Sequence, residues 1–193
     1  MYRLNYKNTE IVFISDTHGA HRSISLEPCD ILIHLGDVCN FGNVAEIEDF
    51  MDWFASQVAQ TKIIVAGNHD AEFAKGLTAF SEFVPEDIAL LDNCKAAILC
   101  DKEGAEEITL ATVPVRLKGI GREWVDLEDV DILLTHCPPR GMLDGKNHYG
   151  SRRLLEHVTK YKPKYHFFGH VHFDEPREQV IDGTTFVNVT RKY

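Results

Sequence analysis

The chain has 193 residues, of which 44% are apolar and 26% are charged, so its length and composition suit one globular domain over residues 1–193. Its net charge of −10 argues against stable binding to a nucleic-acid backbone, which usually requires a basic surface, but is compatible with a small anionic substrate. Every apolar run is far shorter than the roughly 20 residues that span a bilayer, so no membrane contact is expected.

The first half of the chain alternates predicted strands with a predicted helix. The apolar runs IVFIS and DILIHLG predict buried strands that end at Asp16 and Asp37. Residues 43–59 predict a helix because they carry one apolar stripe at helical spacing. The members of this stripe are Val44, Ile47, Phe50, Met51, Phe54 and Val58. The next run, KIIVAG, predicts a strand that ends at Asn68.

The second half begins with a different pattern. Residues 96–115 predict two strands joined by the charged turn DKEGAE, with no helix between them. The runs DILLT and YHFFG predict strands that end at His136 and His170. Between them, the segment SRRLLEHVTK predicts a helix that uses its first serine as N-cap. Residues 180–189 predict a hairpin with Asp-Gly at its turn.

Strands that alternate with helices around a helix-free middle predict an α/β fold, with either one mixed sheet or two sheets face to face rather than a purely parallel sheet. In such sheets, ligands gather at the carboxyl ends of the strands. We therefore expect the five polar residues that end the apolar runs to converge on one rim. Gly36, Gly67 and Gly169 each precede one of them and are expected to let the backbone turn sharply.

The strand ends carry the motifs DTH, GD, GNHD, TH and GHVH. These motifs contain seven candidate metal ligands: Asp16, His18, Asp37, Asn68, His136, His170 and His172. Carboxylates and imidazoles without thiolates favour Mn, Fe or Zn over Ca or Mg. Seven ligands are too many for one ion and suit two ions that share a carboxylate. Three other histidines, His34, His157 and His166, are interpreted as core or loop residues.

The five cysteines are odd in number and form no CxxC pair. This usage argues against a disulfide framework and against a structural zinc site. The first 15 residues lack the basic segment, the long apolar run and the cleavage site of a signal peptide. A cytoplasmic location is therefore expected.

In this order, the five motifs resemble those of the calcineurin-like metallophosphoesterase superfamily, and they extend over residues 16–172. The resemblance implies a four-layer α/β/β/α sandwich of two mixed β-sheets flanked by helices. It also implies a dinuclear metal-dependent hydrolase of phosphoric esters, in which a hydroxide that bridges the metals attacks phosphorus in line. It assigns Asp16, His18, Asp37 and His172 to one metal, and Asp37, Asn68, His136 and His170 to the other, with Asp37 as the bridge.

The same resemblance makes His69 a catalytic residue rather than a ligand. Its imidazole would stabilise the transition state or protonate the leaving oxygen. Asp70 is the second catalytic candidate, because it is expected to orient or polarise His69. Asn68 and His69 would also contact the substrate.

A narrower resemblance is carried by SDTHG, AGNHD, DILLTHCPPRGMLD, KPKYHFFGHVH and DGTTFVNVT. These segments are similar to the small class III phosphodiesterases related to the mammalian metallophosphoesterase-domain proteins. This similarity implies hydrolysis of small phosphodiesters, including cyclic nucleotides, with Mn²⁺ supporting activity in vitro. Arg140 would lie near the mouth of the site and pair with a phosphate oxygen. Between residues 92 and 130 the chain departs from the subgroup, with Arg122, Glu123 and Trp124 in place of a Pro-Trp-rich loop.

Other functions compete with the phosphodiesterase. A phosphomonoesterase or a nucleotide pyrophosphohydrolase would use the same metal centre, and a non-catalytic scaffold would use the fold to bind proteins. The GD motif continues as VCNFG, unlike the GDxVDRG of the Ser/Thr phosphoprotein phosphatases, which argues against that class. His69 beside a full set of ligands favours an enzyme over a scaffold. An oligomer is compatible with the sequence.

Overall fold

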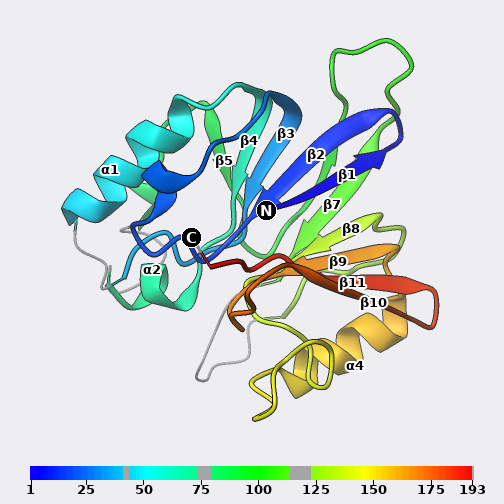
Figure 1. Cartoon of the computed structure of the whole chain (residues 1–193). Helices are drawn as coiled ribbons and strands as arrows, with labels where there is room; N and C mark the ends of the chain where they lie inside the picture. Colours follow the sequence, from blue (N-terminus) through cyan, green and yellow to red (C-terminus); the bar gives the residue numbers. More distant parts are fainter. Residues whose placement is uncertain (41–43, 74–79, 114–122, 193) are drawn as a thin grey trace.

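Two β-sheets lie face to face at the centre of the molecule (Figure 1). The structure is a computed structural model that describes residues 1–40, 44–73, 80–113 and 123–192. For residues 71–73 it describes the backbone and not the side chains. The first sheet has the strand order β1-β2-β3-β4-β5 and the second the order β10-β11-β9-β8-β7-β6. Both sheets are mixed, as the sequence predicts.

The first sheet contains three of the predicted strands and two others. Its members are β1 (Tyr2–Tyr6), β2 (Thr9–Ile14), β3 (Cys29–His34), β4 (Ala59–Ile64) and β5 (Ile88–Leu90). Strands β2 to β5 are parallel, and β1 pairs antiparallel with β2. The carboxyl ends of β2, β3 and β4 therefore lie along one edge of the sheet.

The second sheet contains all of the strands predicted in the second half of the chain. Its members are β6 (Lys95–Ile98), β7 (Ile108–Thr112), β8 (Ile132–Leu134), β9 (Tyr165–Phe168), β10 (Arg177–Ile181) and β11 (Thr184–Asn188). Antiparallel pairs β6–β7 and β10–β11 flank the parallel strands, which confirms both predicted hairpins. Asp182 and Gly183 form the second turn with φ of 49 and 87, as a two-residue turn with both φ positive requires.

The helices whose bounds lie within the described residues are α1 (Val44–Ala55), α2 (Asn68–Phe73) and α4 (Arg152–Tyr161), with a short 3₁₀ turn η1 (His21–Ser23). The predicted N-cap of α4 is confirmed, because the Ser151 side chain accepts a hydrogen bond from the backbone of Leu154. Within the described parts of the chain, no helix combines the length and the apolar character that a membrane crossing requires.

The predicted helix over residues 43–59 is wrong at its end, and residue 43 lies outside the described residues. Helix α1 stops at Ala55, where the Ser56 hydroxyl and the Gln57 side chain both donate to the Trp53 carbonyl. These side chains satisfy a carbonyl of the last turn, so the chain can leave the helix. Val58, predicted to lie on the apolar stripe, is consequently 70% exposed.

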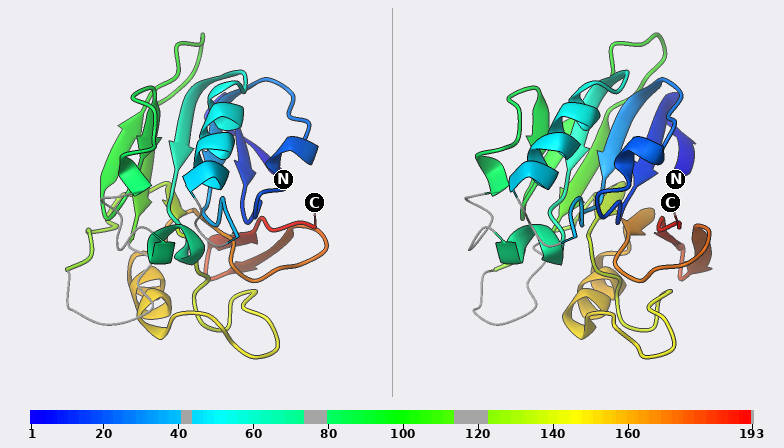
Figure 2. Two further views of the ribbon diagram at one scale, coloured as in Figure 1. Left: turned by 90° about the vertical axis from the view of Figure 1, so that its left-hand side faces the viewer. Right: turned by 60° about the vertical axis from the view of Figure 1, so that its left-hand side comes forward.

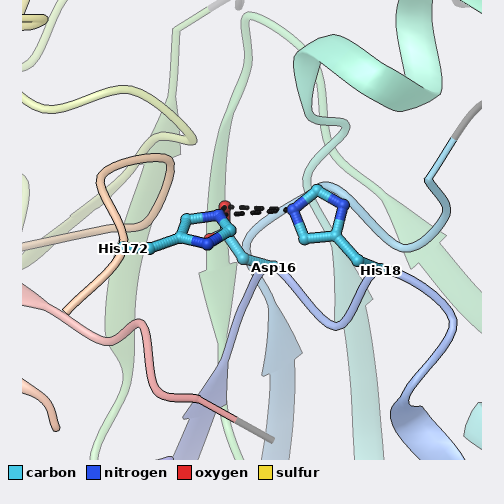
Figure 3. A group of neighbouring side chains, drawn as sticks. All are labelled: Asp16, His18 and His172. Atoms are coloured by element: carbon cyan, nitrogen blue, oxygen red, sulfur yellow. Dashed lines mark hydrogen bonds and ion pairs between the residues drawn. The ribbon is translucent and has the colours of Figure 1, made fainter. Parts of the chain in front are cut away.

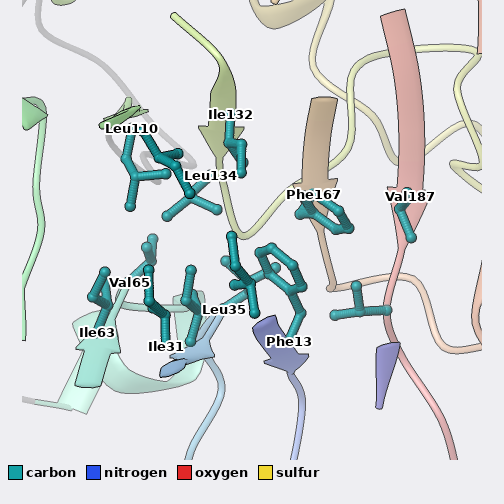
Figure 4. Packing of buried hydrophobic residues seen from close by; sticks show 14 of the residues in the cluster. Phe13, Ile31, Leu35, Ile63, Val65, Leu110, Ile132, Leu134, Phe167 and Val187 are labelled. Atoms are coloured by element: carbon teal, nitrogen blue, oxygen red, sulfur yellow. The ribbon is translucent and has the colours of Figure 1, made fainter. Parts of the chain in front are cut away.

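Apolar side chains fill three layers of core. Figure 4 shows the central layer, in which Phe13 and Ile31 of the first sheet meet Leu134 and Phe167 of the second. The Phe13 and Phe167 rings are stacked with centroids 3.7 Å apart. A second cluster joins the outer face of the first sheet to α1, and a third joins the second sheet to α4 (Figures 1 and 2). The layer order is helix, sheet, sheet, helix, which confirms the predicted sandwich.

The buried carboxylate of Asp131, just before β8, forms hydrogen bonds with residues at both sheets. Asp131 accepts hydrogen bonds from Lys7 at 2.7 Å, Tyr6 at 2.8 Å, the backbone of Thr109 at 3.0 Å and Lys164 at 3.1 Å. Burial opposes ionisation, but these four donors outweigh it and hold the pKa of Asp131 below its usual value. Asp131 is therefore charged in the folded protein at neutral pH.

We expect Asp131→Asn to lower the free energy of unfolding at pH 7 by about 2 kcal/mol, because hydrogen bonds to a charged group are lost. A carboxyl whose pKa is lowered by folding stabilises the protein above the unfolded pKa of about 3.9, and this contribution is lost progressively as pH falls from that value through the lower folded pKa. The difference between variant and wild type should therefore shrink between pH 5 and pH 3 in urea titrations. Asp174→Asn is the control, since Asp174 and its partner Lys192 are both largely exposed and the change should be near zero.

Candidate metal centre

Eight polar residues meet where the carboxyl ends of both sheets come together. Asp16 follows β2, Asp37 follows β3, Asn68 follows β4, His136 follows β8, and His170 follows β9. His18, His69 and His172 lie within two residues of these positions. The side chains fall into overlapping groups whose donor atoms are within 4.8 Å of one another, and Asn68 contacts His136. The structure thus brings together all seven predicted ligands and His69.

Asp16, His18 and His172 form the first group. Figure 3 shows the His18 and His172 rings facing each other beside the Asp16 carboxylate. The Nε2 atoms of the two histidines are 3.3 Å apart, and His172 Nε2 lies 3.2 Å from Asp16 Oδ1. Two imidazole nitrogens and a carboxylate oxygen directed at one region are a donor set typical of sites for Zn, Mn or Fe.

Asp37, His136 and His170 form the second group. His136 Nε2 lies 3.3 Å from Asp37 Oδ2 and 3.0 Å from Asn68 Oδ1. The Asp37 carboxylate belongs in addition to a third group, with His18 and His69. Asp37 therefore lies between the two sides of the rim, where a bridging carboxylate would have to be.

Backbone carbonyls orient two of the histidines. His136 Nδ1 lies 2.7 Å from the Leu35 carbonyl, and His18 Nδ1 lies 3.2 Å from the Cys39 carbonyl. Because a carbonyl can only accept, each Nδ1 carries a proton and each Nε2 is directed toward the carboxylates. Metal-binding histidines are typically held in this way by a hydrogen bond from their other nitrogen. The residues present therefore fit a metal centre in orientation as well as in type.

Charges at the rim are buried and balanced against one another. Burial opposes ionisation of Asp37, but the charge and hydrogen bond of His136 hold the pKa of Asp37 well below its usual value. Burial lowers the pKa of His136, yet Asp37 and Asp16 raise it overall to about 9. The pKa of Asp16 is lowered despite burial, chiefly by its hydrogen bond from His172. Two ionised carboxylates at close range make the rim a favourable place for divalent cations.

Four of the predicted ligands have left-handed backbone conformations. The φ values are 54 for Asp16, 43 for His18, 57 for Asp37 and 66 for His170. This conformation costs a non-glycine residue roughly 1–2 kcal/mol and persists only where the surroundings hold it. Hydrogen bonds between the loops contribute, since the Asp16 N–H donates to Gly36 and the His18 N–H to the Asp37 carbonyl.

Of the three glycines that precede a candidate ligand, Gly36 has a backbone conformation that favours glycine, and Gly67 and Gly169 are glycines for a steric reason. Gly36 has a φ of +91, whereas the other two are not left-handed. A Cβ on Gly67 would lie 2.2 Å from the backbone nitrogen and from Oδ1 of Asp37, and one on Gly169 would lie 2.0 Å from Ser15 Oγ. The absence of a side chain at these two positions allows neighbouring loops to approach, because any Cβ would displace a candidate ligand or its neighbour.

Gly67→Ala should therefore displace Asp37 and weaken Mn²⁺ binding by at least about 10-fold. A loss of this size is typical when a group that orients a metal ligand is changed. Gly183→Ala is the matched control. Its Cβ meets nothing within 4 Å, so its left-handed φ would lower stability without affecting metal binding. Isothermal titration of both metal-stripped variants with Mn²⁺ measures the difference, and equal affinities would show that the contact with Asp37 is unimportant.

His69 lies at the rim with its ring held by a residue that the sequence did not single out. Its backbone N–H donates to Asp37 Oδ1 at 2.9 Å, and its ring Nδ1 lies 2.5 Å from the Asn40 carbonyl. Asn40 also donates from its side chain to the His18 carbonyl at 2.6 Å. Because the contact to His69 uses a backbone atom, the identity of residue 40 gave no signal for it.

Asp70 has partners other than the expected one. Its fully buried carboxylate accepts hydrogen bonds from the backbone of Asp37 at 2.8 Å, of Val38 at 2.9 Å and of Gly67 at 2.8 Å. The atom that orients the His69 ring belongs to Asn40 instead. The described contacts thus tie Asp70 to the loop that carries Asp37, because the first turn of α2 directs its carboxylate at that loop.

Arg140 and the segment at Trp124 complete the set of predicted site residues. Arg140 Nη1 lies 3.3 Å from the His148 carbonyl, and its role at a phosphate stays a prediction. Arg122 lies outside the described residues. The Trp124 ring packs against α4, with the Arg153 guanidinium 4.0 Å from its centroid and the His157 ring at 5.3 Å. Trp124 therefore belongs to the outer core of the second sheet.

Comparison with known proteins identifies relatives over most of the chain. A family model described as calcineurin-like phosphoesterase matches residues 9–174. Metallophosphoesterase domain-containing protein 1 from Homo sapiens is 31% identical, over 94% of this chain and 66% of that protein. The UPF0046 protein C25E10.12 from Caenorhabditis elegans is 33% identical, over 92% of this chain and 73% of that protein. The chain spans about two thirds of the length of these relatives.

Solved structures share the fold. TT1561 from Thermus thermophilus superimposes with a TM-score of 0.61 at 14% identity, over 94% of this chain and 88% of that one. Phosphopantetheinyl hydrolase from Mycobacterium tuberculosis gives a TM-score of 0.63 at 17% identity, over 94% and 89%. At such identities the likeness concerns architecture only. The family match and the sequence relatives go further, and they show that this chain belongs to the calcineurin-like phosphoesterases, a family of metal-dependent phosphoester hydrolases.

Proposed function

We propose that the protein is a phosphodiesterase that uses two divalent metal ions. The observation that carries this proposal is the position of Asp37, whose carboxylate is within reach of His18 and His69 on one side and of His136 and His170 on the other. One ion would be held by Asp16, His18, Asp37 and His172, and the other by Asp37, Asn68, His136 and His170. Mn, Fe and Zn suit this donor set.

When bound, two such ions lower the pKa of water and take up the negative charge that develops on phosphoryl oxygens. The protein contributes a fixed frame for this chemistry. The carbonyls of Leu35 and Cys39 hold the Nδ1 protons of His136 and His18, so that both rings keep Nε2 at the rim. Asp70 holds the backbone of Asp37 against that of Gly67.

His69 is the proposed proton donor. Its Nδ1 proton is engaged by the Asn40 carbonyl, which leaves Nε2 to hold a proton and release it to the leaving oxygen. We assign Arg140 to the phosphate oxygens through its two-pronged guanidinium.

The expected substrate is a small phosphodiester, and the preference for a diester rests on the resemblance to the class III phosphodiesterases. The net charge of −10 supports a small substrate over a long nucleic acid. All five cysteines are free thiols, which supports the proposed cytoplasmic location. We also propose that residues 1–193 act as one domain.

The test compares hydrolysis of bis-p-nitrophenyl phosphate with that of p-nitrophenyl phosphate. Metal-stripped protein is assayed with and without added Mn²⁺, and an Asp37→Ala protein purified in the same way controls for contaminating phosphatases. Mn²⁺-dependent cleavage that favours the diester is the expected result. Preference for the monoester would change the assignment to a phosphomonoesterase. If neither ester nor a panel of cyclic nucleotides and nucleotide pyrophosphates were cleaved, a scaffold would become the better description.

A further inference from the structure

Behind the rim, each sheet carries a buried histidine bonded to a threonine that neighbours a proposed metal ligand. His34, the last residue of β3, has Nε2 3.1 Å from Thr17 Oγ1. His166, on β9, has Nε2 2.9 Å from Thr135 Oγ1. All four side chains belong to residues that are at most 2% exposed. The same histidine–threonine pair thus occurs in both halves of the molecule.

The hydrogen bonds of the first pair fix the direction of its protons. The Gly36 N–H donates to His34 Nδ1 at 3.1 Å, so the ring proton is on Nε2 and is donated to Thr17. Thr17 Oγ1 in turn lies 3.4 Å from the Val38 carbonyl, directly after Asp37. His34 therefore connects the loop after β2 to the loop after β3, both of which carry proposed ligands.

In the second pair the histidine is again the hydrogen-bond donor and the threonine hydroxyl the acceptor. Thr135 Oγ1 donates to the Cys137 carbonyl at 2.7 Å, so it accepts its other hydrogen bond from His166 Nε2. Thr135 and Cys137 are the two neighbours of His136. The hydrogen bonds of Thr135 therefore fix the backbone on both sides of His136, whose imidazole is directed at Asp37.

Packing alone does not account for these histidines. His34 lies against Phe50, with ring centroids 4.8 Å apart, and His166 lies against Phe168 at 5.0 Å. An apolar side chain would fill either place without a polar atom. In the described part of the chain, the buried Nδ1 of His166 has no hydrogen-bond partner, and an unpartnered buried polar atom lowers the stability of the fold. Burial lowers the pKa of both rings to about 3, so they are neutral.

The conformation of the ligands supplies a reason for the arrangement. Thr17 stands between Asp16 and His18, and both of these residues are left-handed. A strained turn of this kind needs an anchor, and the hydroxyl of Thr17 is tied at once to a side chain and to a backbone carbonyl. Without these hydrogen bonds of Thr17, the backbone at Asp16 and His18 could relax, and their side chains would move away from the proposed metal position they share.

We propose that His34 and His166 are positioning residues that hold the ligand loops of the two metal sites through Thr17 and Thr135. The proposal rests on the metal centre described under the proposed function. It adds that each half of the centre has its own neutral imidazole behind it, which touches neither metal nor substrate.

The test is a titration of metal-stripped protein with Co²⁺, followed by visible absorption, on a double-mutant cycle. His166→Leu and Thr135→Val should each weaken Co²⁺ binding by about 10–100-fold and change the absorption bands. The double variant should be no weaker than either single variant, because all three lack the same hydrogen bond. His166→Gln, whose amide N–H can replace Nε2–H, should restore much of the affinity. His34→Leu and Thr17→Val form the corresponding cycle in the first sheet.

Thermal unfolding of the metal-free variants distinguishes positioning from general support of the fold. Small shifts in Tm together with a large loss of Co²⁺ affinity are expected, and His157→Leu, a change on α4 away from the rim, should leave Co²⁺ binding unaltered. Unchanged affinity in the variants, or additive losses that follow Tm, would overturn the proposal. If a leucine variant does not fold, the Thr→Val and His→Gln variants decide it. Wild-type protein that binds fewer than two Co²⁺ ions would instead contradict the dinuclear centre itself.

Discussion

Asp37→Ala should remove both metal ions and lower kcat/KM by about 10³-fold or more. The carboxylate is 2% exposed and lies within reach of two separate groups of donor atoms. Its loss removes the proposed bridge and one of the two negative charges that balance the cations. Metal ions contribute several kcal/mol of charge stabilisation to such reactions, and about 4 kcal/mol corresponds to 10³-fold in rate.

Metal content and activity have to be measured on the same preparation. Mass spectrometry should find two ions per chain in wild-type protein reconstituted with Mn²⁺ and fewer than one in the variant. Asp30→Ala is the control, because Asp30 lies at the other end of β3 and bonds Glu10 and Lys102 instead of the rim. A variant that retained two ions per chain would refute the bridging role of Asp37, whatever its activity.

The fold was predictable where a short stretch of sequence determines it. Strands β2, β3, β4, β8 and β9 are apolar runs whose burial on both faces is visible in their composition. Strand β1 was missed although its residues alternate, with Tyr2, Leu4 and Tyr6 packed on the central core and Arg3 and Asn5 exposed. That alternation, rather than a continuous apolar run, is the signal of a strand with one face in solvent. Strand β5 has three residues, which is too short for any pattern.

The end of α1 shows why a helical spacing of apolar residues can predict a helix that is too long. Val58 continues the helical stripe, so spacing alone predicts a longer helix. The helix ends because Ser56 and Gln57 bond the Trp53 carbonyl and because β4 pairs with β3 from Ala59 onward. Tertiary pairing of this kind overrides a preference that a short segment expresses.

The candidate site was predictable in its side chains and not in its backbone. A polar residue at the end of an apolar run is visible in the sequence, and five such residues do gather at the rim, with three histidines that follow them within two residues. The contact of His69 with the Asn40 carbonyl and the close approach of Gly67 to Asp37 join segments about 30 residues apart through main-chain atoms. Residue identity says little about such contacts. The Asp70 carboxylate bonds the backbone N–H groups of Asp37, Val38 and Gly67 and the Cys39 thiol, and residue identity gives little signal for the main-chain contacts.

His69→Ala should leave both metal ions in place and lower turnover by about 10²–10⁴-fold, the usual contribution of a positioned proton donor. His69 shares its surroundings with His18 and Asp37, so metal content must be shown to be unchanged before the loss is interpreted. His157→Gln is the matched control. Its ring bonds the Val125 carbonyl beside α4, and both metal content and turnover should stay at the wild-type level.

The leaving group separates the two roles that His69 could have. A proton donor matters most when the leaving oxygen is strongly basic, so the loss should be large for phenyl esters and small for p-nitrophenyl esters, whose leaving group departs as a stable anion. A side chain that stabilises charge on the phosphoryl oxygens would instead give similar losses for both esters. Parallel assays of bis-p-nitrophenyl phosphate and diphenyl phosphate make this comparison. Equal losses would assign His69 to charge stabilisation, and unchanged turnover on both esters would remove it from the reaction.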